Sequence, residues 1–339
     1  MIRRAASGDG AQLCDLVLRC PQGDGATALA TDRTPDFFRR AKPFASSCIL
    51  VAEEAGEQIN ATVTIAAKEV RVASRPVRAG YVFDLAVAPE ARGRHLASRV
   101  LHQAEEMALA QGTDVLYAHV MRGNAASHAT FVRAGFEPRA TVVAGVFPLE
   151  ERREDADGGG VEGAEGDVAE AWTPDQWHAA ADLLAAAEEG CDLARGHDGP
   201  SLKDEWTGLT GWLGREVWNR GGALLGLWDH GEIGRYVLRR TGARDEPAVA
   251  PGEGLRAGML LGGAGDSEVL AELFELALGR AGELGMRAVF TGFDERVEPG
   301  WVGARDSMRE PYDLFVKVLR HGPAERLGDR PVRVDPIDL

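Results

Sequence analysis

The sequence has few of the residues that cross-link small secreted proteins or anchor a chain in a membrane. It contains four cysteines in 339 residues, and none of them forms a Cys-x-x-Cys pair. The chain therefore predicts no zinc or other metal site and no disulfide framework. It has no run of about 18 apolar residues, which argues against a transmembrane helix. The first residues lack an apolar core of signal-peptide length, so we expect a cytoplasmic location.

Basic residues are also scarce. The chain has 38 Lys and Arg against 53 Asp and Glu, which gives a formal net charge of −15. Binding to a phosphate backbone depends on Lys and Arg, so we expect no nucleic-acid partner, and no membrane partner either. The acidic balance is compatible with a cationic acceptor such as an amine, and equally with solubility alone.

The length is sufficient for two ordinary domains, and the composition places their boundary. Residues 150–170 carry nine acidic residues, only two basic ones and three consecutive glycines. Such a segment has few apolar side chains to bury, so we predict that residues 150–167 form a solvated linker. The interpretation is a first domain at 1–149 and a second at 168–339.

Residues 1–149 alternate strand and helix patterns. The clearest helix is Arg94–Gln111, where apolar residues recur at helical spacing, and it follows a predicted buried strand at Tyr81–Ala88. Asp114–Val120 predicts the next buried strand, and Asn124 is placed to cap another helix. Thr34–Ala41 also predicts a helix, with Thr34 as its cap.

The second half weakly repeats the first. Its patterns run strand–strand–strand–helix–strand–strand, which predicts an internal structural repeat. Residues 202–218 are rich in Trp and predict a helix. Four tryptophans are candidates for the wall of an acceptor pocket, although tryptophans more commonly belong to the core: Trp206, Trp212, Trp218 and Trp228.

The most informative stretch runs from Tyr81 to Ser98. It predicts a strand, a turn at Pro89, an Arg- and Gly-containing loop, and then a helix. This order presents free backbone N–H groups at a helix N-terminus, where they and the helix dipole favour a pyrophosphate.

Two motifs in this region resemble the GNAT superfamily of acyl-CoA-dependent N-acyltransferases. The first is Arg92-Gly-Arg-His-Leu-Ala97, in the place of the family pattern (Gln/Arg)-x-x-Gly-x-(Gly/Ala). The second places Asn124, Ser127 and Phe131 ahead of Gly135-Phe136, as in the family's second conserved block. The resemblance implies an α/β (α+β) GNAT fold, with a central mixed, mostly antiparallel sheet flanked by helices. The repeat implies two such domains in tandem, the second degenerate.

The resemblance also implies roles for individual residues toward acetyl-CoA as co-substrate. The loop would hold the pyrophosphate through its backbone N–H groups, the strand before it would pair with the pantetheine arm, and Asn124 would bind that arm as well as cap its helix. Together with Ser127 and Phe131, the cofactor-binding residues implied are Leu85, Ala86, Val87, Arg92, Gly93, Arg94, His95, Leu96, Ala97 and Asn124.

Two departures from the family pattern bear on activity. His95 stands where the family usually has Gly, which implies an altered loop path or an outward side chain. Phe131 stands where many relatives have the Tyr that protonates the leaving thiolate, so the usual acid is absent. Loss of this acid slows the reaction without abolishing it.

Asp84 and His119 are the candidates for the catalytic base. Acyl transfer needs a deprotonated amine. Asp84 is the carboxylate nearest the family's usual position, and His119 is predicted across the sheet opening; either acts directly or through a water. The alternatives are that Asp84 only pairs with a basic residue and that His119 is a satisfied core histidine.

The second half has no equivalent phosphate loop. Gly262-Gly-Ala-Gly265 precedes a predicted helix, but Asp266 would repel a pyrophosphate and is better read as the helix cap. We expect this half to pack on the first and to wall the acceptor pocket.

Three functions remain open on the sequence. The first is transfer of an acetyl or other short acyl group to a primary amine on a small molecule or a peptide, by direct attack. The second is a non-catalytic acyl-CoA-binding or regulatory protein, favoured by Phe131 and His95. The third, aminoacyl transfer from tRNA, is opposed by the charge of −15. The identity of the acceptor, the acyl length and a homodimeric state stay undetermined.

Overall fold

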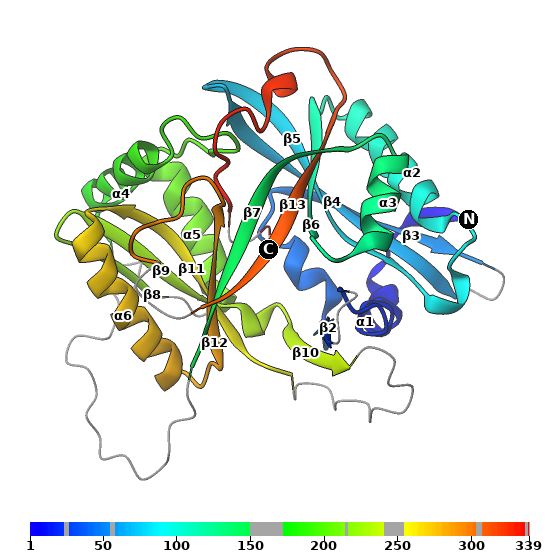
Figure 1. The fold of residues 1–339 in the computed structure, drawn as a ribbon, viewed down its shortest axis with the longest axis horizontal. Helices are drawn as coiled ribbons and strands as arrows, with labels where there is room; N and C mark the ends of the chain where they lie inside the picture. Colours follow the sequence, from blue (N-terminus) through cyan, green and yellow to red (C-terminus); the bar gives the residue numbers. More distant parts are fainter. Residues whose placement is uncertain are drawn as a thin grey trace, which may run out of the picture.

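The fold is described from a computed structural model. It covers residues 1–23, 27–54, 58–149, 172–213, 216–240, 254–302, 307–335 and 338. The predicted linker at 150–167 lies outside the described residues. Helices and strands alternate along both halves, and one continuous sheet runs through the molecule (Figure 1).

The first half contributes seven strands and three α-helices among the described residues, with short 3-10 turns at Ser7–Asp9, Phe37–Ala41 and Pro89–Ala91. In chain order the elements are β1 (Ile2–Arg4), α1 (Gly10–Leu18), β2 (Thr27–Asp32), β3 (Ser46–Glu53), β4 (Ile59–Val72), β5 (Arg75–Val87), α2 (Leu96–Ala110), β6 (Val115–Met121), α3 (Ala125–Arg133) and β7 (Glu137–Pro148).

The second half follows the same kind of order, with 3-10 turns at His230–Glu232 and Pro323–Arg326. Its elements are α4 (Pro174–Ala187), α5 (Gly199–Leu213), β8 (Glu216–Arg220), β9 (Ala223–Asp229), β10 (Arg235–Arg240), β11 (Ala257–Gly265), α6 (Ser267–Glu283), β12 (Ala288–Asp294) and β13 (Met308–Val318).

The two halves exchange strands at the middle of the sheet. The strand order is β1-β3-β4-β5-β6-β13-β7-β12-β11-β9-β8. Strand β7 of the first half pairs with β12 of the second, and β13 of the second half pairs with β6 of the first. The two exchanged strands also pair with each other and cross the centre of the molecule side by side (Figure 1). Each half of the sheet is therefore completed by the other half.

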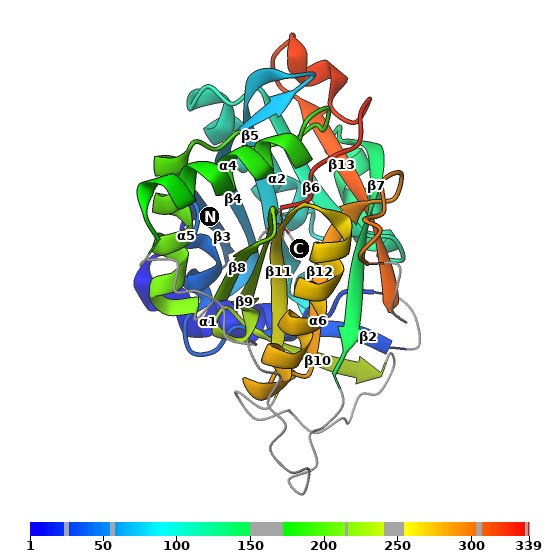
Figure 2. The same cartoon turned by 90° about the vertical axis from the view of Figure 1, so that its left-hand side faces the viewer.

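The sheet is mixed and mostly antiparallel, with helices on both faces, as predicted. Only two of the strand pairs described are parallel, β5 with β6 and β11 with β12. Helices α1, α2 and α3 share one hydrophobic core with the first part of the sheet. The opposite face of that part forms a common core with α4 and α5, and α6 covers the other face of the second part (Figure 2). The predicted packing of the second half on the first is observed in this common core.

The predicted internal repeat is visible at the two parallel pairs. Strand β5 pairs with β4 across an irregularity near Phe83 and is followed by α2 and β6. Strand β11 pairs with β9 across an irregularity between Gly262 and Ala264 and is followed by α6 and β12. In each case the parallel pairing extends over only three residue pairs.

Two local predictions were wrong. The segment at Thr34–Ala41 forms only a 3-10 turn at Phe37–Ala41, and Asp36, not Thr34, caps it by accepting from the Phe38 N–H at 3.0 Å. The helix predicted over 202–218 ends at Leu213, and Trp218 lies on strand β8. Trp218 is fully buried in the core beside α6, so tertiary packing outweighed local pattern there.

A small ribbon ties the second half to the start of the first. Strands β2 and β10 form a separate two-stranded antiparallel sheet, with Asp32 opposite Arg235 at one end. The turn that follows β2 carries Arg33 and leads to Arg40. The second half therefore holds a segment of the first half in place beside the sheet.

Candidate active site

A cavity of about 880 Å³ opens where β5 and β6 separate. The two strands are paired only from Ala79 and Val115 to Tyr81 and Tyr117, although both continue for several residues. Asp84 has φ +50°, a left-handed conformation that interrupts the regular pleat of β5. Beyond this point β5 turns away from β6 and its inner edge is left facing the cavity.

The outer end of the cavity lies at the start of α2. The first N–H groups of a helix have no intrahelical acceptor, and here they belong to Leu96, Ala97 and Ser98, which all line the cavity. His95 precedes them with φ +58° and an exposed side chain. His95 thus adopts the left-handed conformation that a glycine would take. Of the two alternatives that the sequence left open, an altered loop path or an outward side chain, the structure shows the outward side chain. Gly93 has φ +80° in the same turn.

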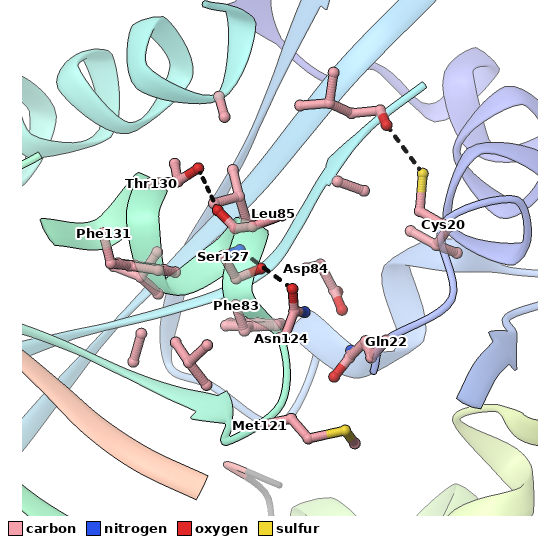
Figure 3. Close-up of a pocket in the computed structure, with 18 of the residues that line it drawn as sticks. Cys20, Gln22, Phe83, Asp84, Leu85, Met121, Asn124, Ser127, Thr130 and Phe131 are labelled. Atoms are coloured by element: carbon pink, nitrogen blue, oxygen red, sulfur yellow. Dashed lines mark hydrogen bonds between the residues drawn. The ribbon is translucent and has the colours of Figure 1, made fainter. Parts of the chain in front are cut away.

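Helix α3 forms the facing wall. Asn124 caps it, since its Oδ1 accepts from the Ser127 N–H at 3.2 Å. Figure 3 shows Asp84 and Leu85 of β5 between Ser127 and Thr130 of α3 on one side and Cys20 on the other. Cys20 closes that side through a hydrogen bond from Sγ to the Val87 carbonyl at 3.2 Å. The hydrogen bond from the Ser127 N–H holds the Asn124 side chain in position at the cavity wall.

The Phe131 ring is 4% exposed and packs edge-on against Phe136, with ring centroids 5.0 Å apart. It lines the cavity but supplies no hydroxyl group. The position of the usual acid is thus filled by a core residue, as the sequence indicated.

Asp84 sits at the inner end of the cavity in a buried ion-pair cluster. Its Oδ1 accepts from Arg40 Nη1 at 2.8 Å and from Arg33 Nη2 at 3.2 Å. The Arg40 guanidinium also lies 4.7 Å from the centre of the Phe83 ring. The sequence alternative in which Asp84 pairs with a basic residue is therefore what the structure contains, with two partners in place of one.

His119 lies across the opening from Asp84, on β6. Both ring nitrogens are buried and have no hydrogen-bond partner among the described residues, so His119 is not a satisfied core histidine. Burial, followed by the positive charges of Lys68 and Arg40, lowers the pKa of His119 to about 3. The imidazole is neutral at ordinary pH, with a lone pair available to accept a hydrogen bond.

A residue from the far end of the sequence completes the inner wall. Asp338 is buried, and its side chain accepts from Lys68 Nζ and from the Tyr117 hydroxyl, both at 2.8 Å. Its backbone carbonyl accepts from the Tyr81 hydroxyl. Burial raises the pKa of both Asp338 and Tyr81. Tyr312 of β13 lies on the same wall.

The structure brings nearly all predicted site residues to this one cavity. The exception among them is Arg94, whose side chain points outward and pairs with Glu54 at 2.7 Å. The predicted residues that line the cavity are Asp84, Leu85, Ala86, Val87, Arg92, Gly93, His95, Leu96, Ala97, His119, Asn124, Ser127 and Phe131.

Sequence reasoning missed the residues that reach the inner end from distant segments. Arg33 and Arg40 come from the connection between β2 and β3, and Tyr312 and Asp338 come from the second half. No local motif identified them. The two arginines could have been noticed in the sequence 33–40, because charged residues flank two aromatic residues there: Arg-Thr-Pro-Asp-Phe-Phe-Arg-Arg.

The second half walls the cavity through Tyr312 and Asp338, and not through its tryptophans. Trp206, Trp218 and Trp228 are all buried at 4% exposure or less and belong to the cores. Trp212 falls among the side chains that are not described. The second half therefore contributes to the wall of the cavity, through residues other than the predicted tryptophans.

The corresponding opening in the second half is small. It measures about 200 Å³, lies between β11 and β12, and is lined in part by Val332 and Arg333. The Arg333 guanidinium donates to the Gly262 carbonyl within it. Asp266 caps α6 by accepting from the N–H groups of Glu268 and Val269, as predicted. A chain segment thus occupies the place that an extended ligand takes in an open cleft.

The described part of the chain lacks two features, a metal-binding cluster and a membrane-spanning helix. Within it, no group of three or more His, Cys, Asp or Glu side chains is arranged to hold a metal ion. None of its helices combines the length and apolar character needed to cross a membrane.

The fold and the cavity define a class of acyltransferase-like proteins, and comparison with known proteins agrees. Residues 11–136 match the model of the Acetyltransferase (GNAT) family. Saccharomyces cerevisiae N-myristoyltransferase with bound myristoyl-CoA is similar in structure over 95% of this chain and 84% of its own, with a TM-score of 0.62 and 12% identity. A tandem GNAT protein from the clavulanic acid biosynthesis pathway, solved without AcCoA, aligns over 95% of this chain and 99% of its own, with a TM-score of 0.57 and 17% identity. No curated protein sequence matches the chain.

Residues 11–136 therefore match the GNAT acyltransferase family, and over its whole length the chain has the fold of a tandem GNAT protein. The recognition made from the two sequence motifs is confirmed.

Proposed function

We propose that this protein transfers an acetyl or other short acyl group from acyl-CoA to a primary amine by direct attack. The observation that carries the proposal is the course of the cavity. It runs from the free N–H groups at the start of α2, along the open edge of β5, to a buried polar end between Asp84 and His119. A pyrophosphate, an extended arm and a reacting group have matching surroundings in that order.

The proposed roles follow from the geometry. The backbone from Arg92 to Ala97 binds the pyrophosphate, the open edge of β5 at Leu85–Val87 pairs with the pantetheine arm, and the Asn124 amide binds the same arm. The structural similarity to an N-myristoyltransferase with bound myristoyl-CoA supports an acyl-CoA as the co-substrate.

The inner end of the cavity supports a short acyl group over a long one. The charged side chains of Arg33, Arg40 and Asp84 line it. Burying a long alkyl chain against buried charges costs free energy that a small acetyl group avoids.

His119 is the residue best placed to assist the amine. In the reaction the amine nitrogen bonds to the thioester carbonyl carbon, the carbon–sulfur bond breaks, the nitrogen loses a proton and the thiolate gains one. With a pKa of about 3 the neutral imidazole accepts a hydrogen bond from the amine and orients it, and the released proton passes to water. Asp84, compensated by two guanidinium groups, positions the arginines and the strand bend. Because Phe131 has no acidic hydrogen, the thiolate takes its proton from water.

The test is calorimetric titration with acetyl-CoA on the natural protein and on Ala97→Glu. The added carboxylate places bulk and negative charge at the helix N-terminus, so we expect micromolar binding that falls at least tenfold in the variant. Ala110→Glu is the matched control, because it makes the same change at the exposed far end of α2, about 20 Å away. Equal affinity in all three proteins contradicts the proposed phosphate site.

A non-catalytic acyl-CoA-binding protein is the second candidate, and Phe131 in place of an acid favours it. The two functions differ in turnover. Release of CoA thiol that depends on an added amine supports the enzyme, and tight acetyl-CoA binding without thiol release over a broad set of amines supports the binding protein.

A further inference from the structure

Two buried arginines lie at the inner end of the cavity. The side chains of Arg33 and Arg40 are 5% and 9% exposed. Both guanidinium groups donate to the same oxygen of Asp84, at 3.2 and 2.8 Å. Two cations thus share one carboxylate at a buried site.

Two other charged groups nearby have partners of their own. Asp32, which precedes Arg33, accepts from the Thr34 N–H at 2.9 Å. Lys68 lies deeper and pairs with Asp335 and Asp338, each at 2.8 Å. The neighbouring tyrosines supply no negative charge, since burial raises the pKa of Tyr236 to about 12. His119 and His230 are held neutral by burial, which lowers the pKa of both.

Arg33 has hydrogen-bond donors to spare. Its Nε and Nη1 are buried and have no hydrogen-bond partner among the described residues, while Nη2 is used by Asp84. Leaving guanidinium N–H groups unpaired in a buried place costs free energy. Arg33 also lines the cavity, so a ligand in the cavity lies beside this side chain.

The position of Arg33 is built by both halves of the protein. It directly follows Asp32, the last residue of β2, which pairs with β10 of the second half. Gly234 lies so close that a Cβ there would be 3.2 Å from Arg33 Cδ. The second half thus fixes an arginine of the first half against the cavity. Packing of the two halves against each other does not by itself require an arginine at this position.

We propose that the amine acceptor also carries an anionic group, a carboxylate or a phosphate, and that Arg33 binds this group with Arg40 as the supporting charge. The inference rests on the proposed acyl transfer and names the class of its acceptor: a small molecule with a primary amine and an anion a few bonds apart. The anion then lies at Arg33, and the amine faces the opening between Asp84 and His119.

The experiment is a competition among amines that share one skeleton. The protein is incubated with acetyl-CoA and an equimolar mixture of β-alanine, 2-aminoethyl phosphate, β-alaninamide and ethanolamine, and the acetylated products are measured by mass spectrometry. Glycine and 4-aminobutanoate, each with its amide, extend the set to other lengths. We expect anionic amines to be acetylated at least tenfold faster than their neutral counterparts, and the two charged arms show whether the anion is a carboxylate or a phosphate.

Three variants connect the preference to Arg33. Arg33→Gln is expected to remove the preference for anionic amines, and Arg33→Lys to retain part of it, because a lysine keeps the charge but not the donor geometry. Arg39→Gln is the matched control. That arginine is on the same segment, does not line the cavity, and pairs with Glu232. Acetyl-CoA affinity, measured in every variant, shows whether the fold and the co-substrate site are intact.

The outcomes distinguish a failure of this inference from a failure of the proposed acyl transfer on which it rests. Equal or faster acetylation of neutral amines overturns the inference and leaves the acyltransferase standing. Acetyl-CoA binding without acetylation of any anionic amine in the set also overturns it. Absence of acetyl-CoA binding to the natural protein overturns the proposed function itself.

Discussion

Asp84 and His119 face each other across the cavity but differ in what surrounds them. Asp84 is held by two buried guanidinium groups and occupies the left-handed bend of β5. His119 is enclosed among aromatic rings, 6.0 Å from Tyr81 and 5.9 Å from Tyr117 between centroids, with no hydrogen bond to either nitrogen among the described residues. Asp84 is electrostatically compensated, and His119 is left with unused hydrogen-bonding capacity.

His119 is predicted to make stability depend on pH. In the unfolded chain it takes up a proton as the pH falls below about 6.5, whereas in the folded protein its pKa is about 3. Stability is thus fully present above pH 6.5 and is lost as the pH falls from 6.5 toward 3. Between pH 7.5 and 5.5 the natural protein is expected to lose about 1.4 kcal/mol more unfolding free energy than His119→Gln.

Urea denaturation at the two pH values measures this difference. His102→Gln is the control, because His102 lies on the exposed face of α2 with its side chain 72% accessible. A natural protein and a His119→Gln variant that lose stability in parallel would show that His119 is not held neutral in the folded state.

His95 illustrates how a family position tolerates another residue. It adopts the left-handed conformation suited to Gly, at a cost of about 1 kcal/mol for a residue with a Cβ. Its side chain points to solvent and leaves the backbone N–H groups of α2 accessible. The loop therefore keeps its path, and His95 in place of the usual Gly costs conformational free energy alone.

At the scale of elements, the cavity exists because β5 and β6 stop pairing. The bend at Asp84 turns β5 outward, and α2 follows directly with its N-terminus at the mouth of the opening. The ribbon of β2 and β10 then closes the side opposite α3 and carries Arg33. In the proposed function, the strand edge and the helix terminus bind the co-substrate, and the ribbon positions a residue that contacts the acceptor.

Gly234→Ala is predicted to disturb the acceptor end of the cavity selectively. An added Cβ would lie 2.9 Å from Thr31 Cγ2 and 3.0 Å from the Asp32 carbonyl, so the end of β2 must shift and Arg33 with it. Small displacements of a positioning group are costly, and we expect the KM for the acceptor to rise roughly tenfold. Acetyl-CoA affinity should stay within about twofold, since α2 and β5 are not touched.

Steady-state kinetics with the best amine, together with acetyl-CoA titration, measures both effects. Gly282→Ala on α6 is the matched control, because nothing lies within 4 Å of its added Cβ. If acetyl-CoA affinity falls as much as acceptor affinity, the ribbon supports the whole fold and has no separate role in the acceptor site.

At the scale of the whole molecule, the exchange of β7 and β13 makes the two halves interdependent. Strand β6 of the first half has β13 of the second as its antiparallel neighbour, and β7 pairs only with strands of the second half. A common hydrophobic core lies between the halves. The cavity wall at Tyr312 and Asp338 exists only when both are present.

We therefore predict that residues 1–149 and 172–339, produced as separate chains, fold only together. Each piece alone exposes unpaired strand edges and half of a common core, which favours aggregation over folding. Co-expression with an affinity tag on one piece is expected to recover a 1:1 complex that binds acetyl-CoA. A soluble 1–149 piece that binds acetyl-CoA alone with native affinity would show that the first half is self-sufficient.

The sequence determined the parts of this protein that depend on neighbouring residues. Period and capping placed α2, α3 and α6, and two motifs with a short separation marked the α2 loop and Asn124. Helix patterns and phosphate loops are local, because each is formed by residues within one or two turns of each other. The fold class and the family followed from these local features.

Only the tertiary structure decided the inner end of the cavity. Arg33, Arg40, Tyr312 and Asp338 meet there through the β2–β10 ribbon and the exchange of β7 and β13. No local periodicity records which strand of one half pairs with which strand of the other. The charge of the whole chain, −15, likewise gave no indication of a buried pair of arginines, since a local field depends on which side chains are brought together and removed from water.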